Sequence, residues 1–590
     1  MSTMREFDCL DHKVTFDEAC VNVISDNSNY DSLWLYSLSS DCVSCPYKRL
    51  MSIPSIVDSS LKFSTVKAVK WRVLDNDGKN EYISAENTND IFCELSPNMG
   101  QYGLYELAIQ DKACSFRTLK NPTYPYTELF VISAIIVLIL LGISAGRFLW
   151  RTYRRRYGKG GKEEATNKEP TKRRVKAIDA FRGASTLFMI FVNDGSGSYS
   201  VLGHTTWNGM LPGDLVFPCF MWIMGVCVPI ALSAQLRRGI PKLEIAFTVL
   251  KRSFLLFLIG VSLNTLGTNA QLEKIRVFGV LQRFGVTYLV VSVMYLCLEP
   301  SLQLQDQDSS RNRVTRVLRD MQVLLPYWSF MLILVMVHCG LTFGLAVPNC
   351  PTGYLGPGGT HEDGYYMNCT GGAAGYIDRV VLTINHIFAG PTIASVYGSG
   401  PFDPEGILGN CRVAYVDINL RCRICNERRA SFASGCLTAT FQVYLGVHAG
   451  VILMMYKNWK ERVVRWLSWA VLYGVLGCIL HFCNVIPVNK NLWSLSFVFV
   501  STSFALAFLS GCYLLIDVVR VWQGGPFRIA GMNALVLYVG HMMCYQIFPF
   551  HWRIGEMDSR ALCFIESIWV VVLWTIIAYI MHHKRTYITL

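Results

Sequence analysis

Long apolar runs, separated by short clusters of positive charge, constrain this chain more than any other feature. A helix of about 20 apolar residues is long enough to cross the hydrocarbon core of a bilayer. We read about eleven such runs, near residues 128–150, 183–194, 214–236, 253–268, 279–298, 322–346, 436–456, 466–486, 493–518, 530–549 and 562–582. The second run is short, so its helix is expected to begin upstream, near Ile178. Only 16% of the residues are charged, against about 25% in soluble proteins, and a polytopic α-helical membrane protein is therefore predicted.

Lysine and arginine gather in every second loop between these runs. The clusters lie at 147–176, 237–252, 311–319, 457–465 and 582–585. Cytosolic loops of membrane proteins carry an excess of Lys and Arg. We therefore expect these loops and the C-terminus to face the cytosol, and the N-terminal segment and the loop around His204 to face the other compartment. The net charge of +12 arises from these clusters and does not indicate nucleic-acid binding.

Residues 1–127 are predicted to form a small, mainly β domain outside the membrane. Alternation of polar and apolar residues, as in Val66 to Val73, is typical of strands. An even number of cysteines in such a compartment favours disulfides, and the segment has Cys9, Cys20, Cys42, Cys45, Cys93 and Cys114. For the Cys42-Val-Ser-Cys45 motif a disulfide is favoured over a zinc or redox site, because no second such pair accompanies it.

The remaining boundaries follow from the same patterns. We expect a first transmembrane helix at 128–150, a basic cytosolic linker at 151–177, and a domain of about ten transmembrane helices at 178–590. The Gly- and Pro-rich segment 344–409 is the longest loop on the His204 side. It contains Asn368-Cys369-Thr370, an acceptor pattern for N-glycosylation, and Cys350 could pair with Cys369 or with the N-terminal domain.

Residues 410–435 do not fit the topology, because they bring five arginines to a side that otherwise has few. This atypical insertion is either a retained intron or gene-model error, or a tolerated loop outside the cytosol.

One polar loop lies between two apolar runs, Ala184–Val192 and Leu215–Pro229, and no Lys or Arg occurs from Gly183 to Leu236. Between the two runs lie Asn193, His204, Trp207, Asn208 and Asp214. A single loop histidine is more often structural than catalytic, so the loop by itself leaves both roles open.

Two further polar groups interrupt apolar runs. Arg283 lies inside the run at 279–298, where a charged residue is costly and suggests either a functional role or an internal partner. Asn533 and His541 are eight residues apart, which places them on one helical face. His541 could equally be a core histidine that is hydrogen-bonded to a neighbouring helix.

Several sequence blocks together resemble one family, the lysosomal heparan-α-glucosaminide N-acetyltransferases, which are transmembrane acyltransferases. The blocks include Asp179-Ala-Phe-Arg-Gly183, His204-Thr-Thr-Trp-Asn-Gly209, Asp214-Leu-Val-Phe-Pro218, Gly279 to Tyr288, Asn368 to Arg379 and Gly531-Met-Asn533. The resemblance implies that His204 is the active-site histidine and Asn193 its companion. It also implies a homodimer in the lysosomal membrane that takes acetyl-CoA from the cytosol and acts on the terminal glucosamine of heparan sulfate, without a metal.

Acyl transfer by such a site needs a base and a donor for the developing oxyanion. Histidine has a suitable proton affinity and can also accept an acyl group, so an acetyl-histidine intermediate and direct transfer both remain open. Asn193 could stabilise the thioester oxygen or orient the imidazole.

The other candidate residues divide between the two substrates. We expect the CoA phosphates to be bound by cationic side chains, and the candidate cofactor-binding residues are Arg182, Arg276, Arg283, Asn533 and His541. The candidates for binding the sugar are Trp207, Asn208 and Asp214. A polytopic transporter, or an acyltransferase of this architecture acting on another sugar, is the alternative interpretation.

Overall fold

The computed structural model describes most of the chain, in twelve segments. They are residues 14–26, 32–54, 56–75, 78–87, 90–110, 113–157, 174–266, 271–298, 319–387, 393–400, 434–555 and 557–588. Of the predicted insertion at 410–435, residues 410–433 lie outside the described residues, and Ser434 begins a helix.

The N-terminal segment folds into two packed β-sheets, which confirms a mainly β domain. The strands are β1 (Glu18–Asp26), β2 (Ser32–Ser39), β3 (Tyr47–Pro54), β4 (Ile56–Ser64), β5 (Val69–Leu74), β6 (Tyr82–Ile83), β7 (Ile91–Leu95), β8 (Leu104–Gln110) and β9 (Ala113–Lys120). One sheet has the order β4-β1-β8-β9 and the other β6-β3-β2-β5-β7. Strands β1 and β8 are parallel, and the other neighbours are antiparallel.

Alternating side chains of both sheets form the core of this β domain. Val21 and Leu107 from one sheet and Leu35 and Trp71 from the other are buried in a single cluster, as the period of two predicts for strands with one face inward. Disulfides join Cys42 to Cys45 and Cys93 to Cys114. The disulfide interpretation of the Cys42–Cys45 motif is thereby confirmed.

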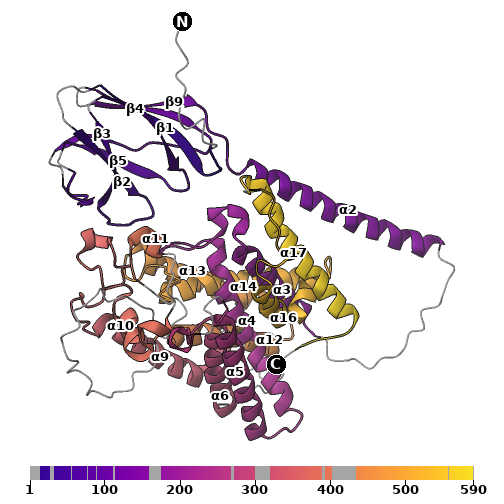
Figure 1. Ribbon diagram of the computed structural model, residues 1–590. Helices are drawn as coiled ribbons and strands as arrows, with labels where there is room; N and C mark the ends of the chain where they lie inside the picture. The colour runs from indigo at the N-terminus through magenta and orange to yellow at the C-terminus, as the bar shows by residue number, and fades with distance from the viewer. Residues whose placement is uncertain are drawn as a thin grey trace.

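The rest of the described chain is helical. The helices are α2 (Thr127–Tyr157), α3 (Lys176–Asn193), α4 (Val216–Leu236), α5 (Lys242–Asn264), α6 (Val280–Leu298), α8 (Arg319–Val323), α9 (Leu325–Gly344), α10 (Gly372–Leu382), α11 (Ile393–Tyr397), α12 (Ser434–Met455), α13 (Trp459–Phe482), α14 (Leu495–Tyr513), α15 (Phe527–Met532), α16 (Ala534–Met543) and α17 (Arg560–His583). Figure 1 shows the β domain at one end of the helical bundle. We call this end of the bundle the β-domain end. Helix α2 begins beside α17 and then runs away from the bundle (Figure 1).

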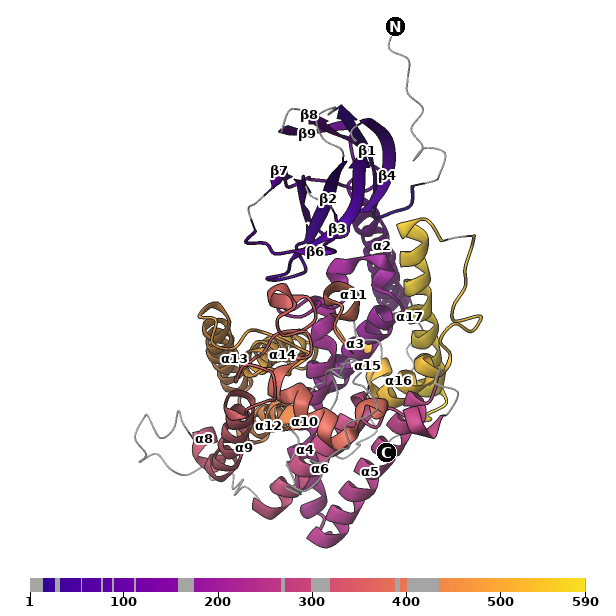
Figure 2. The same ribbon diagram turned by 60° about the vertical axis from the view of Figure 1, so that its left-hand side comes forward.

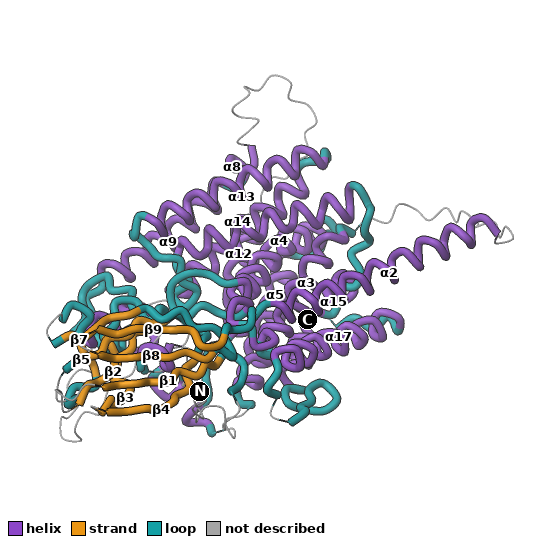
Figure 3. Tube along the Cα trace, turned by 90° about the horizontal axis from the view of Figure 1, so that it is seen from above, coloured by secondary structure: helices purple, strands orange, loops and turns teal. Residues whose placement is uncertain are grey.

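Eight helices in the described residues are long and apolar enough to cross a membrane. They are α4, α5, α6, α9, α12, α13, α14 and α17. Helices α5 and α6 pack side by side (Figure 2), as do α13 and α14 (Figures 2 and 3). A bilayer core offers the backbone no hydrogen bonds from water, so continuous helices are the expected form of such runs.

The other three predicted runs have different forms. The run at 128–150 lies within α2, and the run at 183–194 forms α3, which begins at Lys176, two residues before the expected Ile178. The run at 530–549 is not one helix, because α15 and α16 are separated at Asn533. There the Asn533 side chain donates to the Thr586 carbonyl (3.2 Å) and accepts from the Ile588 amide (3.2 Å), which ties the C-terminal tail to the break.

Two helix starts were predicted too late. Helix α5 begins at Lys242 rather than near 253, and α13 begins at Trp459 rather than near 466. In both cases the basic residues that were interpreted as loop lie inside the helix. Arg252 stacks over the Tyr288 ring at 4.8 Å and Arg465 over the Tyr456 ring at 4.1 Å. Aromatic faces stabilise guanidinium groups at helix positions that an apolar pattern excludes.

Glycines allow the helices at the centre of the bundle to approach backbone to backbone. A Cβ atom on Gly225 of α4 would collide with the Val443 carbonyl of α12, and one on Gly446 of α12 with the Trp222 carbonyl. In the same way, a Cβ atom on Gly183 of α3 would collide with the Phe527 carbonyl, and one on Gly531 of α15 with the Asp179 carbonyl. Small residues at such contacts are the usual means by which membrane helices pack closely.

The substitution Gly446→Ala should destabilise the bundle, because the added methyl group forces α4 and α12 apart. Overpacking of this kind costs about 1–3 kcal/mol. We expect a lower melting temperature in detergent, followed by tryptophan fluorescence. Gly511→Ala in α14 is the matched control, since a Cβ there meets no described atom within 4 Å. Equal melting temperatures for the two variants would show that the α4–α12 contact does not need glycine.

Candidate functional site

The loop between α3 and α4 folds around one buried carboxylate, that of Asp214 in a short 3₁₀ helix at Pro212–Leu215. His204 Nδ1 lies 2.9 Å from Asp214 Oδ1. Asp214 Oδ2 accepts hydrogen bonds from the amide and the hydroxyl of Thr205 (both 3.1 Å) and from the Leu211 amide (3.0 Å). An ionised carboxylate only accepts, so Nδ1 carries the imidazole proton and the lone pair is on Nε2.

Lys490, 286 residues away in sequence, completes this cluster. Its Nζ atom lies 3.3 Å from Asp214 Oδ1 and 3.1 Å from His204 Nδ1. With the imidazole proton placed on Nδ1, both nitrogens are donors, and Asp214 Oδ1 is the acceptor that they share. The Lys490 side chain is 15% exposed and that of Asp214 only 1%. A buried carboxylate is stable only when it is paired and hydrogen-bonded. Lys490 provides that charge, and it was not among the candidate site residues predicted from the sequence.

The segment around Lys490 also fixes the backbone of the His204 loop. Asn491 donates to the Thr206 carbonyl (3.2 Å), and the Gly209 amide donates to the Val488 carbonyl (2.8 Å). Asn489 donates to the side-chain oxygen of Asn208 (3.1 Å). The loop is therefore held at several points by a segment that precedes α14.

The three predicted sugar-binding residues lie in this loop with different surroundings. Trp207 is buried and donates from Nε1 to the Leu355 carbonyl at 3.0 Å. Asp214 is buried beneath His204. Asn208 is exposed, and its amide oxygen is bound to Asn489. In this structure the contacts of Trp207 and Asp214 support the loop.

His204 opens on a cavity of about 440 Å³ that runs into the helical bundle. The polar residues that line it are Arg182, Asn193, His204, Arg252, Tyr288, Lys490 and Tyr538, and its apolar walls come mainly from α3, α4, α6 and the α15–α16 region. The lining residues of α4 extend from Val216 to Ala231, which is about 22 Å at the helical rise. The cavity thus connects the β-domain end with the interior of the bundle.

Two guanidinium groups line the cavity away from the β-domain end. Arg182, near the start of α3, donates to the Gly531 carbonyl (3.3 Å) and to Cys227 Sγ (3.2 Å). Arg252, midway along α5, packs on the Tyr288 ring. A cavity with an imidazole at one end and cations at the other is suited to an anionic molecule with a reactive far end.

Asn193 lines the cavity and hydrogen-bonds to His541 (2.9 Å). His541 Nδ1 lies 3.1 Å from the Leu537 carbonyl. Since a carbonyl only accepts, Nδ1 donates to it, and His541 Nε2 accepts from the Asn193 amide. The structure describes both Asn193 and His204, and no hydrogen bond joins them. Asn533 and His541 do not line the cavity; the first contacts the C-terminal tail and the second orients Asn193.

Arg276 and Arg283, the other predicted cofactor residues, lie outside the cavity lining. Arg283 is buried, and its guanidinium stacks at 4.8 Å over Trp493. Arg276 lies in the segment before α6, where its carbonyl accepts from Asn264 (3.0 Å). The sequence thus identified Arg182 as a cavity residue and missed Arg252.

Outside the cavity, the predicted features of the long loop also have defined positions. Cys350 and Cys369 form a disulfide, which confirms one of the two expected pairings. Asn368 lies in an exposed turn. Within the described residues, no cluster of three or more His, Cys, Asp or Glu side chains is arranged to hold a metal ion.

Comparison with known proteins gives consistent results. Residues 174–304 match a family model described as "Heparan-alpha-glucosaminide N-acetyltransferase, catalytic". The heparan-α-glucosaminide N-acetyltransferase of Mus musculus is 32% identical over 599 residues, which cover 94% of this chain and 86% of the relative. The Homo sapiens enzyme is 32% identical over 602 residues, covering 95% and 86%. The family match includes the His204 loop, Asp214 and the α3, α4 and α5 walls of the cavity.

Replacement of Asp214 should destabilise the fold as well as the site. Asp214→Ala leaves the Lys490 ammonium and the Thr205 and Leu211 amides without their acceptor, and breaking a buried pair costs about 3–5 kcal/mol. Asp214→Asn keeps an acceptor oxygen and should lose less. Thermal unfolding in detergent measures both, with the exposed Glu244→Ala as control. A melting temperature of Asp214→Ala equal to that of the control would contradict this role.

Proposed function

The chain belongs to the heparan-α-glucosaminide N-acetyltransferase family, and we propose that it moves acetyl from cytosolic acetyl-CoA to the terminal, non-reducing glucosamine of heparan sulfate in the lysosomal lumen. The observation that carries this proposal is the single cavity that begins at His204 and continues to Arg182 and Arg252. Acetyl-CoA is too highly charged to cross a bilayer. An enzyme embedded in the membrane can take the acetyl group at one face and release it at the other.

His204 is proposed to act through Nε2. In direct transfer, the glucosamine nitrogen attacks the thioester carbonyl, Nε2 takes the amine proton, and the CoA thiolate leaves. In the two-step alternative, Nε2 attacks the thioester and the CoA thiolate leaves, which gives an acetyl-imidazole. The amine then attacks the acetyl carbon, the bond from that carbon to Nε2 breaks, and Nε2 takes the amine proton. Asp214 accepts from Nδ1 in either case and stabilises the positive charge that develops on the ring.

Asn193 is proposed to assist at the same carbonyl group. One N–H of its amide donates to His541, which leaves the second N–H for the oxygen of the thioester as negative charge develops there. The role of His541 is then to orient Asn193. Of the three residues predicted to bind the sugar, the exposed Asn208 is the one proposed to contact it, while the buried Trp207 and Asp214 support the loop.

The phosphates of CoA are proposed to bind near Arg182 and Arg252. Both guanidinium groups line the cavity away from His204, and an extended molecule bound to them would place its far end toward the imidazole. Guanidinium groups bind phosphate through paired, charge-assisted hydrogen bonds. This assignment replaces Arg276 and Arg283 as the preferred candidates, since neither lines the cavity.

We also propose the cellular setting that the family implies. The charge pattern of the loops favours a luminal β domain and a cytosolic C-terminus. In this orientation the exposed Asn368 would lie on the side where N-glycosylation occurs. A homodimer in the lysosomal membrane is part of the same proposal.

His204→Ala should abolish acetyl transfer, since general-base catalysis alone contributes about 10²–10⁴-fold. The assay is labelled acetyl-CoA with glucosamine and detergent-solubilised protein, where a transporter would make no product. His583→Ala, an exposed histidine at the end of α17, is the control and should be fully active. Wild-type turnover by His204→Ala would refute its role. Product formed from another amino sugar but not from glucosamine would instead point to a different acceptor.

Arg182→Gln and Arg252→Gln should each raise the KM for acetyl-CoA about tenfold, which corresponds to one charge-assisted contact, with a smaller change for glucosamine. Initial rates at varied acetyl-CoA measure this. Arg276→Gln and Arg283→Gln are the comparison. If only those two change the acetyl-CoA kinetics, Arg276 and Arg283 bind the phosphates, and the assignment to Arg182 and Arg252 is wrong.

A further inference from the structure

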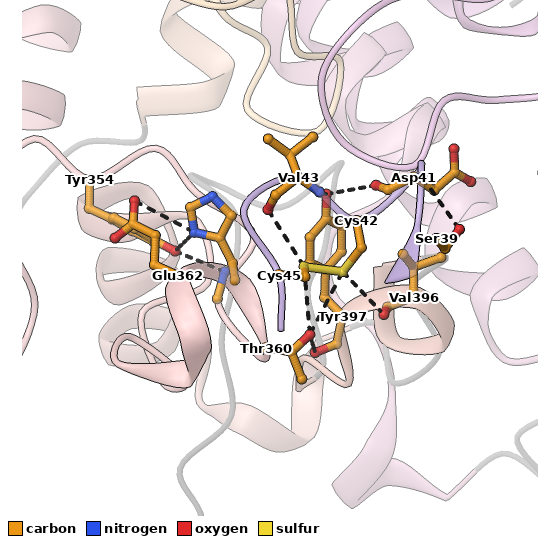
Figure 4. Close-up of a disulfide and its surroundings, with 12 residues drawn as sticks. Ser39, Asp41, Cys42, Val43, Cys45, Tyr354, Thr360, Glu362, Val396 and Tyr397 are labelled. Atoms are coloured by element: carbon orange, nitrogen blue, oxygen red, sulfur yellow. Dashed lines mark hydrogen bonds and ion pairs between the residues drawn. A yellow bond between two sulfur atoms is a disulfide. The ribbon is translucent and has the colours of Figure 1, made fainter. Parts of the chain in front are cut away.

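The loop closed by the Cys42–Cys45 disulfide brings the β domain into contact with the helical domain. It joins β2 to β3 and lies against segments near Thr360 and Tyr397 of the long loop before α12 (Figure 4). The Glu362 amide donates to the Ser44 carbonyl at 2.6 Å. The Thr360 hydroxyl lies 3.8 Å from the sulfur atoms of both cysteines.

Tyr397 fixes the backbone of this disulfide loop. Its hydroxyl accepts from the Val43 amide (3.2 Å) and donates to the Asp41 carbonyl (2.9 Å), as Figure 4 shows. Burial raises the pKa of Tyr397 above its ordinary value, so the hydroxyl keeps the proton that it donates. The position of Asp41 relative to the helical domain is therefore set by two hydrogen bonds of one buried side chain.

The same disulfide shares a hydrophobic cluster with both loops of the functional site. Cys45 is buried together with Trp207 of the His204 loop, Leu492 of the Lys490 segment, and Ile393 and Tyr397 of α11. Residues from four distant parts of the chain thus exclude water beside the His204 loop. The β domain is continuous with the packing of the site, although it lies outside the apolar helices.

One polar contact extends directly from the β domain to the His204 loop. Asp41 Oδ2 accepts from the Thr206 hydroxyl at 3.3 Å, and Asp41 Oδ1 pairs with Lys67 Nζ at 2.9 Å. Thr206 is two residues beyond His204, and its carbonyl is already bound by Asn491. Thr206 is therefore held from one side by the Lys490 segment and from the other by the β domain.

We propose that Asp41 of the β domain is a positioning residue for the acetyl transfer, acting through Thr206 on the imidazole of His204. This inference rests on the proposed function. His204 has Asp214 beneath its ring, and its side chain is 37% exposed. Asp214 determines which nitrogen carries the proton, while the contacts of Thr206 determine where the backbone that carries the ring lies.

The expected consequence is a loss of rate and not of acetyl-CoA binding. Small displacements of a reacting group are costly to the chemical step, whereas the proposed phosphate contacts at Arg182 and Arg252 lie elsewhere in the cavity. Loss of one hydrogen bond to a charged acceptor corresponds to a fall in kcat of about tenfold. The KM for acetyl-CoA should stay within about twofold of the wild-type value, because the contacts that bind acetyl-CoA before the reaction are unchanged.

The test is a double-mutant cycle in the full-length protein with Asp41→Ala and Thr206→Val. Each single variant should lower kcat about tenfold, and the double variant should be no worse than either single one, because both remove the same contact. Asp41→Asn keeps an oxygen that accepts from Thr206 but loses the charge that pairs with Lys67, and it should recover most of the rate. Asp75→Ala, an exposed carboxylate at the end of β5, is the matched control.

The outcomes separate this inference from the proposed function. If the wild-type protein makes no acetylated product, the proposed function fails. If it does, but Asp41→Ala and Thr206→Val both match Asp75→Ala in kcat, Asp41 has no positioning role. Effects of the two single variants that multiply in the double variant would also overturn the proposal. If Asp41→Ala does not fold, Thr206→Val and Asp41→Asn still decide the question from the other side of the contact.

Discussion

The burial of one carboxylate, Asp214, is the constraint on which the site depends. Removing an ionised carboxylate from water costs several kcal/mol unless partners replace the lost hydration. Asp214 obtains those partners from its own loop, through His204, Thr205 and Leu211, and from Lys490 far along the chain. The loop must therefore close around the carboxylate, and this closure also favours the imidazole tautomer with its lone pair on Nε2, the atom that we propose as base or nucleophile.

The cavity beneath His204 depends on close helix contacts behind its walls. Helices α3 and α4 supply much of the lining. Each also packs closely against another helix through glycine, α3 against α15 at Gly183 and Gly531, and α4 against α12 at Gly225 and Gly446. The carboxylate of Asp517 also fixes the start of α3, because it accepts hydrogen bonds from the Lys176 and Ala177 amides. These contacts place Arg182 and Asn193 on the cavity wall, about three helical turns from one another.

The sequence predicts the fold class and the site loop because both depend on local patterns. Eight of the apolar runs form the expected long helices, and the strands of the β domain follow from alternation. The break at Asn533 was not predictable, since it depends on contacts with Thr586 and Ile588 at the C-terminal tail. Lys490 was missed for the same reason, as its partners are 286 residues away. Arg252 was assigned to a loop because a charged residue did not fit the apolar pattern of a spanning helix. The Tyr288 ring, on which its guanidinium packs, explains its position in α5.

In the proposed function, acetyl enters the cavity at the Arg182 side and leaves it at His204. Reconstituted vesicles containing the oriented protein test it most directly, with labelled acetyl-CoA outside and glucosamine trapped inside. With the basic loops facing outward, labelled N-acetylglucosamine should accumulate inside the vesicles while CoA is released outside. Product that appears only when both substrates are on the same side of the membrane would contradict the account.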